Sequence, residues 1–264
     1  MTESCSRLKA PAIALGLALF GAALAAGPGL ADTNTAGANL PMKGKYSTLD
    51  KLPDWSGVWE NKSGIHLTDG PGIEKNFPPY NDEWAAKYRE VLAQAALGKP
   101  VNDPTANCLW PGMPRVMWQP YPFEILFSPG RVTTTHEIYS QVRRIYTDGR
   151  KHPADVDPTY NGHSIGHWEG DTLVVDTVGL RGDTMYQNTG MPHSDALHVT
   201  ERWHLVAPNR LEIEVTMIDP KAFTKPYVSK RYYERHNDWD MLEYVCEENN
   251  RNPNVGGVTQ AILK

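Results

Sequence analysis

The stretch YNGHSIGHWEGDTLVVDTVGLR, residues 160–181, predicts the β-hairpin on which the fold assignment depends. An extended arm over His163–Glu169 is followed by a Gly170-Asp171 turn and then by the apolar run Thr172–Val178. Gly170 permits the positive φ that a tight turn requires, and valine-rich runs favour a pleated, half-buried surface. The same alternation of short apolar runs and turn residues recurs along the chain, which predicts a β-sheet protein.

Further strands are predicted on both sides of this hairpin, with one helix before them. The helix covers residues 81–97, because its apolar side chains share one face and Gly98 and Pro100 follow its end. A Pro-rich connection rich in aromatic side chains runs to Pro122 and is predicted to pack against the sheet as a lid or plug. After it, strands are predicted over residues 123–127, 131–136, 137–147, 196–206, 210–218, 227–236 and 241–247. About nine or ten antiparallel strands without crossover helices predict an all-β barrel or sandwich.

The N-terminus has the three regions of a secretory signal peptide. Arg7 and Lys9 form a short basic region, residues 11–26 are apolar, and Gly29-Leu30-Ala31 supplies small residues for cleavage. The apolar region is too short for a membrane span, although a buried N-terminal helix is an alternative. We therefore expect the mature protein in the periplasm or outside the cell. The predicted organisation is a signal peptide over 1–31, a flexible leader over 32–51, a single β-barrel domain over 52–250 and a C-terminal tail over 251–264.

The charge balance argues against two classes of partner. Without Glu3, Arg7 and Lys9, the mature chain carries 24 Lys and Arg against 30 Asp and Glu, a net charge of −6. A mildly acidic chain has no overall attraction for nucleic acid or for anionic lipid. We therefore expect no nucleic-acid partner and no membrane insertion of the mature protein.

Two cysteines remain after export, because Cys5 lies in the predicted signal peptide. In an oxidising compartment, Cys108 and Cys246 are expected to form one disulfide. A loop of that length stabilises by roughly 4–5 kcal/mol in the chain-entropy model. Two free buried thiols are the alternative, because spacing does not establish proximity.

The chain resembles two groups of β-barrel proteins. The segment Asp54-Trp55-Ser56-Gly57-Val58-Trp59 has the Gly-x-Trp of lipocalin or calycin barrels, in which a first-strand Trp closes one end, although an ordinary aromatic core strand has the same pattern. Three further motifs are DGRKHP at residues 148–153, the WEGDTLVV hairpin and HSDALHVTER at residues 193–202. With these motifs and the first-strand segment, the chain resembles a family of secreted bacterial proteins of the sphingomonad type. The resemblance covers most of residues 53–250. It implies an antiparallel lipocalin/calycin-like β-barrel and suggests small aromatic substrates.

Strand alternation places Glu201 inside the predicted barrel. Over residues 197–205 polar and apolar side chains alternate, and Glu201 falls on the face that carries Val199 and Trp203. Desolvation raises the pKa of a buried carboxyl group, as a general acid or base at neutral pH requires. A buried Glu–Arg structural pair is the alternative.

Four further residues complete the predicted catalytic set. His193 is the alternative to Glu201 for proton transfer, and His152 is a second acid or base. Arg144 would bind substrate charge if it points inward, whereas an outward Arg144 is an ordinary solvated charge. Tyr139 would donate a hydrogen bond to the substrate.

Neither a cofactor nor a metal is expected. His163 and His167 lie about 13 Å apart on an extended arm, too far for one ion. A convergence of His152, His163 and His193 at the barrel mouth is the alternative. Residues 162–166 fit the letters G-x-S-x-G, but no helix follows to form a nucleophile elbow.

These features predict an exported small-molecule-binding β-barrel. The expected activity is that of a cofactor-independent acid–base lyase or isomerase acting on a small aromatic compound, because aromatic walls and one buried carboxyl group suffice for such chemistry. The alternative is a non-catalytic lipocalin-like carrier of apolar ligands. The buried carboxylate favours the enzyme, since a carrier gains little from a costly buried charge.

Overall fold

The computed structural model describes residues 46–63, 78–99, 103–187 and 190–249, together with the short strands β10 (Asn254–Val255) and β11 (Val258–Thr259). The predicted signal peptide, most of the predicted leader and most of the C-terminal tail lie outside these residues. Within them, no helix is both long enough and apolar enough to cross a membrane.

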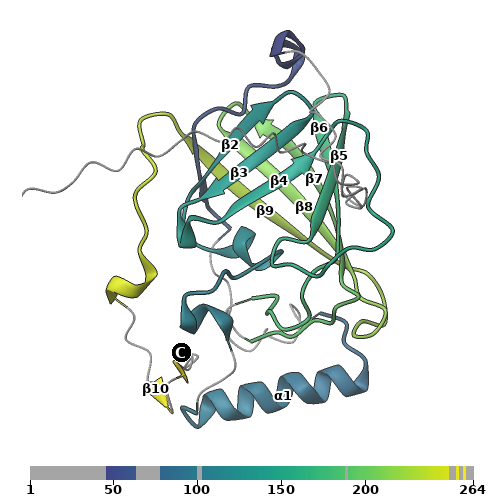
Figure 1. Ribbon diagram of the computed structural model, residues 1–264, viewed down its shortest axis with the longest axis vertical. Coiled ribbons are helices and arrows are strands. Elements are labelled where there is room, and N and C mark those ends of the chain that lie inside the picture. The colour runs from purple at the N-terminus through teal and green to yellow at the C-terminus, as the bar shows by residue number, and fades with distance from the viewer. Residues whose placement is uncertain are drawn as a thin grey trace, which may run out of the picture. The chain divides into compact units, whose positions relative to one another are not determined.

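Nine strands form a closed barrel in which chain neighbours are also sheet neighbours (Figure 1). The predicted all-β barrel is therefore confirmed. The predicted hairpin is β5 and β6, which pair from His163–Val178 to Glu169–Thr172. The strands are β1 (Val58–Asn61), β2 (Phe123–Ser128), β3 (Arg131–His136), β4 (Val142–Tyr146), β5 (His163–Glu169), β6 (Thr172–Val178), β7 (His198–Ala207), β8 (Arg210–Ile218) and β9 (Tyr227–His236).

The barrel closes between β1 and β9, which corrects one predicted strand. Residues 241–247 are not a strand, and β9 pairs instead with β1 over the register Val58–His236 to Asn61–Tyr233. Pairing the two ends of the sheet satisfies the backbone groups that an open edge would leave free. The segment after β9 is thereby released from the sheet and runs to a single turn of 3₁₀ helix, Cys246–Asn249.

The connection between β3 and β4 corrects a second prediction. Residues 137–147 are not one continuous strand: a 3₁₀ turn over Ile138–Ser140 separates β3 from β4. The chain has no Gly or Pro at this point, and Tyr139 and Ser140 take the positive φ values of the turn, 56° and 47°. A turn built from residues that disfavour this conformation leaves no local sequence signal.

The sequence predicted that all strands pair antiparallel, and this prediction is wrong for one pair. β4 and β5 pair in parallel at Ile145–Ser164 and Tyr146–Ile165. The Asp148-Gly149 turn therefore does not form a hairpin, because the chain from 147 to 162 returns along the barrel before β5 begins. This irregular return segment carries His152.

Aromatic side chains fill the barrel interior. Trp55, Trp59 and Trp203 are fully buried, and Phe123 packs edge-on against Tyr233 with ring centroids 5.1 Å apart. Burial of one such side chain contributes about 1.5–3 kcal/mol to folding. The inside of the barrel is thus a packed core.

The Pro-rich connection packs against this core, as predicted. Its second 3₁₀ turn, Arg115–Trp118, is buried, and Met117 accepts a 2.6 Å hydrogen bond from the hydroxyl of Tyr233 in β9. Its first turn, Pro104–Asn107, is capped by Asp103, whose side chain accepts from the N–H of Thr105. Both turns carry residues that matter for the candidate site.

Helix α1 (Asp82–Ala96) agrees with the predicted helix. The side chain of Asn81 accepts a 3.1 Å hydrogen bond from the N–H of Trp84, which satisfies one free donor of the first turn. The helix buries Tyr88, and Asn81 also donates to the carbonyl of Lys221. These contacts attach α1 to the connection between β8 and β9.

Candidate functional site

Glu201 lies inside the barrel, as the alternation of β7 predicted, with 0% of its surface exposed. Both of its carboxylate oxygens accept hydrogen bonds from Arg143, one from Nη1 at 3.1 Å and one from Nη2. Arg143 is also fully buried. The structure therefore contains the buried Glu–Arg pair that was the structural alternative to a catalytic role.

Arg143 also binds two hydroxyl groups on neighbouring strands. Its Nη2 donates to Thr177 Oγ1 at 2.9 Å, and its Nε and Nη2 each lie 3.2 Å from Ser164 Oγ. The network joins β4, β5, β6 and β7 in order, including the parallel β4–β5 pair. Ser164 is buried in this network, so its G-x-S-x-G pattern does not present a nucleophile.

Arg144 is exposed, so the interpretation of an inward Arg144 is wrong. Side chains alternate between the two faces of β4, so only one of the adjacent residues Arg143 and Arg144 can face the interior. Ile145 is buried, and the residue two positions before it, which shares its face, is Arg143. The inward residue is Arg143. Outward, Arg144 is a solvated charge.

His193 is buried and held at both ring nitrogens. Nδ1 donates to the carbonyl of Ser194 at 2.9 Å, which leaves Nε2 to accept from the hydroxyl of Thr184 at 2.8 Å. Burial lowers the pKa of His193, with smaller opposing effects from the Ser194 hydrogen bond and nearby carboxylates. A neutral imidazole with both nitrogens occupied connects the segment before β7 to the fold.

His152 and His163 converge on the outer surface of the barrel, but His193 does not join them. The two Nδ1 atoms lie 2.8 Å apart, and His152 Nε2 lies 3.3 Å from Asp176 Oδ2. The other oxygen of Asp176 contacts His198. Among the residues the structure describes, no three His, Cys, Asp or Glu side chains are arranged to hold a metal ion.

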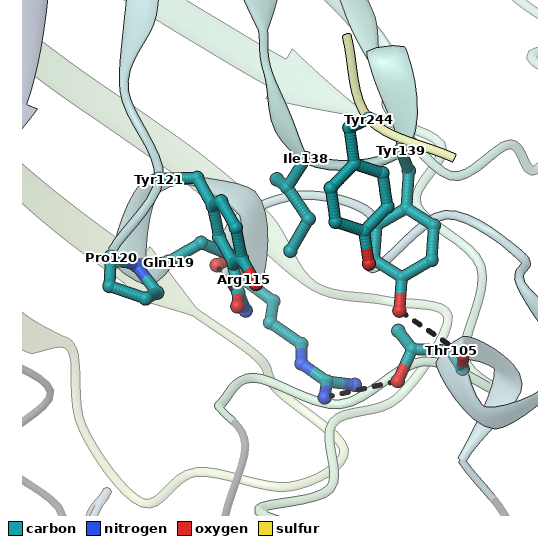
Figure 2. Close-up of a pocket in the computed structure, with 8 residues that line it drawn as sticks. All are labelled: Thr105, Arg115, Gln119, Pro120, Tyr121, Ile138, Tyr139 and Tyr244. Atoms are coloured by element: carbon teal, nitrogen blue, oxygen red, sulfur yellow. Dashed lines mark hydrogen bonds between the residues drawn. The ribbon is translucent and has the colours of Figure 1, made fainter. Parts of the chain in front are cut away.

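A cavity of about 330 Å³ lies between the Pro-rich connection, the β3–β4 turn and the segment after β9 (Figure 2). We call it the tyrosine pocket. Its volume is in the range of small-ligand sites. Of the five predicted site residues, only Tyr139 lines it. The described lining residues are Thr105, Arg115, Gln119, Pro120, Tyr121, Ile138, Tyr139 and Tyr244.

Three tyrosine rings form its walls, with Tyr121 on one side and Tyr139 and Tyr244 on the other in Figure 2. Tyr244 contacts both of the others: its ring centroid lies 5.6 Å from that of Tyr121, edge-on, and 5.2 Å from that of Tyr139. The Tyr139 hydroxyl donates to the carbonyl of Thr105 at 3.1 Å. Burial raises the pKa of Tyr139 and of Tyr244, so both hydroxyl groups stay protonated at neutral pH.

The backbone is strained around this pocket. In the part of the chain that the structure describes, three residues other than glycine have positive φ: Cys108, Tyr139 and Ser140. Tyr139 lines the cavity, Ser140 follows it, and Cys108 follows the turn that supplies Thr105. Each such residue costs on the order of 1–3 kcal/mol, and strain of this kind collects at functional sites.

A buried ion pair forms the polar floor of the pocket. Arg115 Nη1 and Nη2 donate to the two oxygens of Asp103 at 2.8 and 2.9 Å, and both side chains are buried. Burial raises the pKa of Asp103, but the hydrogen bonds and charge of Arg115 outweigh burial and hold that pKa below its ordinary value. Asp103 is therefore ionised at neutral pH.

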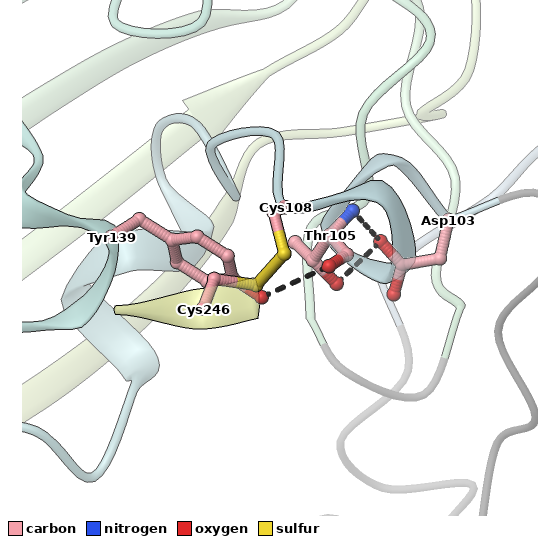
Figure 3. The surroundings of a disulfide bond; sticks show 5 residues. All are labelled: Asp103, Thr105, Cys108, Tyr139 and Cys246. Atoms are coloured by element: carbon pink, nitrogen blue, oxygen red, sulfur yellow. Dashed lines mark hydrogen bonds between the residues drawn. A yellow bond between two sulfur atoms is a disulfide. The ribbon is translucent and has the colours of Figure 1, made fainter. Parts of the chain in front are cut away.

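The predicted disulfide is confirmed and lies next to the pocket (Figure 3). Cys108 and Cys246 have Cα atoms 5.6 Å apart across a sequence separation of 138. Tyr244 precedes Cys246 by two residues, and the N–H of Leu242 donates to Glu137 Oε2 at 3.0 Å. The disulfide thus holds the wall formed by Tyr244 against the rest of the pocket.

Sequence reasoning missed Tyr121, Arg115 and Tyr244 as site residues. One signal was available, because a pairing of Cys108 with Cys246 implies that Tyr244 lies near residues 105–108. The role of Tyr121 had no such signal.

A second, more open groove of about 530 Å³ lies beside helix α1. Its charged residues are already paired, Arg181 with Asp183 and Asp195 with Lys221. It has one aromatic lining residue, Trp84. It therefore encloses an aromatic ligand less well than the tyrosine pocket does.

The sequence matches no known protein-family model and no curated protein. The resemblance to secreted sphingomonad-type barrels therefore stays a prediction.

Proposed function

We propose that this protein binds a small aromatic molecule in the tyrosine pocket. The observation that carries the proposal is a cavity of about 330 Å³ with three tyrosine walls. Aromatic rings prefer edge-on or offset contacts with other rings, and each such pair contributes about 0.5–1.5 kcal/mol beyond area burial. The hydroxyl of Tyr139 and the amide of Gln119 supply polar partners for a ligand substituent.

The non-catalytic binding protein is the better supported of the two predicted functions. Glu201, His193, His152 and Arg144 do not line the tyrosine pocket, so a ligand bound there does not meet the predicted proton-transfer groups. Acid–base catalysis as a lyase or isomerase is the second proposal. The strained backbone of Tyr139 supports it, with the hydroxyl of that residue turning from the Thr105 carbonyl to donate a hydrogen bond to the substrate.

Export to the periplasm or beyond is part of the same proposal, as is membership of the sphingomonad-type, lipocalin-like family. A disulfide, a closed barrel and the buried Trp59 of the Gly-x-Trp segment support both. The expected mature protein begins at Asp32 and has no nucleic-acid or membrane partner. N-terminal sequencing of protein from a periplasmic extract tests the cleavage site, and a retained N-terminus would contradict export by this route.

Titration calorimetry tests the binding site. We expect a one-to-one complex with methoxyphenols, and Tyr121→Ala and Tyr244→Ala should each weaken it about 2- to 12-fold, the equivalent of one lost ring contact. Tyr46→Ala is the matched control, because Tyr46 is 71% exposed and does not line the pocket. Unchanged affinity in both pocket variants, or no binding by the wild type, would remove the proposal.

Product analysis after incubation separates carrier from enzyme. A carrier returns every ligand unchanged. If wild-type protein converts a ligand, the Tyr139→Phe variant keeps the aromatic ring of the wall and loses one polar partner, so it should still bind the ligand, with a modest loss of affinity, and lose conversion. Conversion that survives in Tyr139→Phe would exclude a catalytic role for the Tyr139 hydroxyl.

A further inference from the structure

We propose that the tyrosine pocket selects uncharged aromatic ligands, such as phenols, aryl ethers and amides, over aromatic carboxylates. This inference rests on the proposed function and specifies its ligand class. An arginine in an aromatic pocket would ordinarily indicate a carboxylate ligand, since the guanidinium fork matches a carboxylate. Three features of this pocket argue for the opposite preference.

The first feature is that the fork of Arg115 already holds a carboxylate. Its two terminal nitrogens donate in parallel to the two oxygens of Asp103, at 2.8 and 2.9 Å, and Nη2 also lies 3.4 Å from Thr105 Oγ1. A ligand carboxylate could take the same bidentate position only by displacing Asp103. Asp103 is further held by the N–H and the hydroxyl of Thr105, both at 2.9 Å.

The second feature is the balance of charge in the pocket. Arg115 is the one charged side chain among the described lining residues, and Asp103 cancels its charge from directly behind it. Burial raises the pKa of Tyr139 and of Tyr244, so both are uncharged at neutral pH, and Gln119, Ile138 and Pro120 carry no charge. An entering carboxylate would lose hydration without meeting a net positive charge, whereas a neutral ligand of the same shape would lose much less.

The third feature is the charge of the segment that supplies Tyr244. Residues 237–248 contain five acidic side chains and no Lys or Arg, and all five are exposed. Tyr244 lines the pocket and the disulfide holds Cys246 beside it, so Glu243 and Glu247 follow the chain next to residues at the pocket. These two acidic side chains add negative charge beside the pocket, which disfavours the approach of an anion.

Calorimetry with ligand pairs of equal shape and different charge tests the inference on the wild-type protein. At a pH near 7, 4-hydroxybenzamide should bind at least about tenfold more tightly than 4-hydroxybenzoate. Equal affinities, or tighter binding of the benzoate, would overturn the selectivity while leaving the proposed binding site in place. Binding of neither compound, nor of methoxyphenols, would overturn the proposed function and the selectivity together.

The pH dependence of the benzoate supplies a second measurement without any variant. As the pH falls from about 7 toward about 4.5, a growing fraction of the ligand becomes the neutral acid, so its apparent affinity should rise toward that of the amide. The amide is the control for titration of the protein and should change little. A benzoate affinity that stays constant or falls would contradict the inference.

Asp103→Asn tests the source of the selectivity, because the amide keeps the shape of the side chain and removes its charge. Arg115 then carries an uncompensated charge, and the preference should shift toward the benzoate by about tenfold or more. Asp195→Asn is the matched control, since Asp195 is exposed and pairs with Lys221 away from the pocket. An Asp103→Asn protein that folds, by its circular dichroism, and keeps the wild-type preference would overturn the assignment of selectivity to Asp103.

Discussion

Replacing Glu201 by Gln should destabilise the barrel, because the Arg143–Glu201 pair is structural. The substitution keeps the size of the side chain and removes its charge. Arg143 remains charged and fully buried, with only the neutral hydroxyl groups of Ser164 and Thr177 as strong partners. Removing one member of a buried ion pair costs about 3–5 kcal/mol, a large fraction of the 5–15 kcal/mol that stabilises a typical domain.

Urea unfolding with the disulfide intact measures this change. Tryptophan fluorescence reports it directly, because Trp203 lies two residues from Glu201 and is also fully buried. With a slope near 3 kcal/mol/M, the expected loss lowers the unfolding midpoint by about 1–2 M urea. Ligand binding in the tyrosine pocket should be unchanged in buffer, since Glu201 does not line it.

The double variant Arg143→Met with Glu201→Leu supplies the decisive comparison. Removing both charges leaves no unpaired ion, and Ser164 and Thr177 still hydrogen-bond each other at 2.9 Å, so stability should return to within about 1 kcal/mol of the wild type or exceed it. The exposed pair Arg202–Glu169 is the matched control and should cost at most about 1 kcal/mol when broken.

Two results would refute this reasoning. One is a Glu201→Gln protein that unfolds at the wild-type midpoint. The other is a double variant as unstable as the single variant. A stable Glu201→Gln protein that has lost conversion of an aromatic ligand would support the catalytic prediction for Glu201.

Three further changes should have measurable effects on the free energy of unfolding. Burial lowers the pKa of His136 to about 3, so between about pH 6.5 and pH 3 the unfolded chain binds a proton that the folded chain does not. The free energy of unfolding should therefore fall by about 1.4 kcal/mol for each pH unit below roughly pH 6.5, and His136→Gln should flatten this slope. Asn81→Ala removes the cap of helix α1 and should cost about 1 kcal/mol in urea unfolding, whereas no loss would exclude the cap as a stabilising contact. Gly162→Ala should cost more than about 1 kcal/mol, because the φ of Gly162 is 62° and a Cβ there would lie 2.5 Å from the carbonyl oxygen of Val178. Gly170→Ala is the control, because Gly170 has the same φ but open space around its Cβ position, and it should cost less. Equal costs for the two variants would show that the protein relieves the contact with Val178.

Local features of the sequence determined much of the fold. The Gly170-Asp171 turn between two alternating segments predicted the β5–β6 hairpin, and the spacing of apolar residues predicted helix α1. Alternation along β7 also placed Glu201 inside the barrel. These predictions hold because each depends on neighbouring residues and on a repeat of 2.0 or 3.6 residues, which the sequence contains directly.

Only the tertiary structure decided which distant residues meet. The pairing of β1 with β9, the choice of Arg143 over Arg144 as the partner of Glu201, and the parallel β4–β5 register depend on how the sheet closes. The tyrosine pocket joins residues from 105 to 244 through a turn that lacks Gly and Pro and through a disulfide. Contacts of this kind depend on the packing of the whole chain, because no local pattern specifies the position of a residue more than 100 positions away.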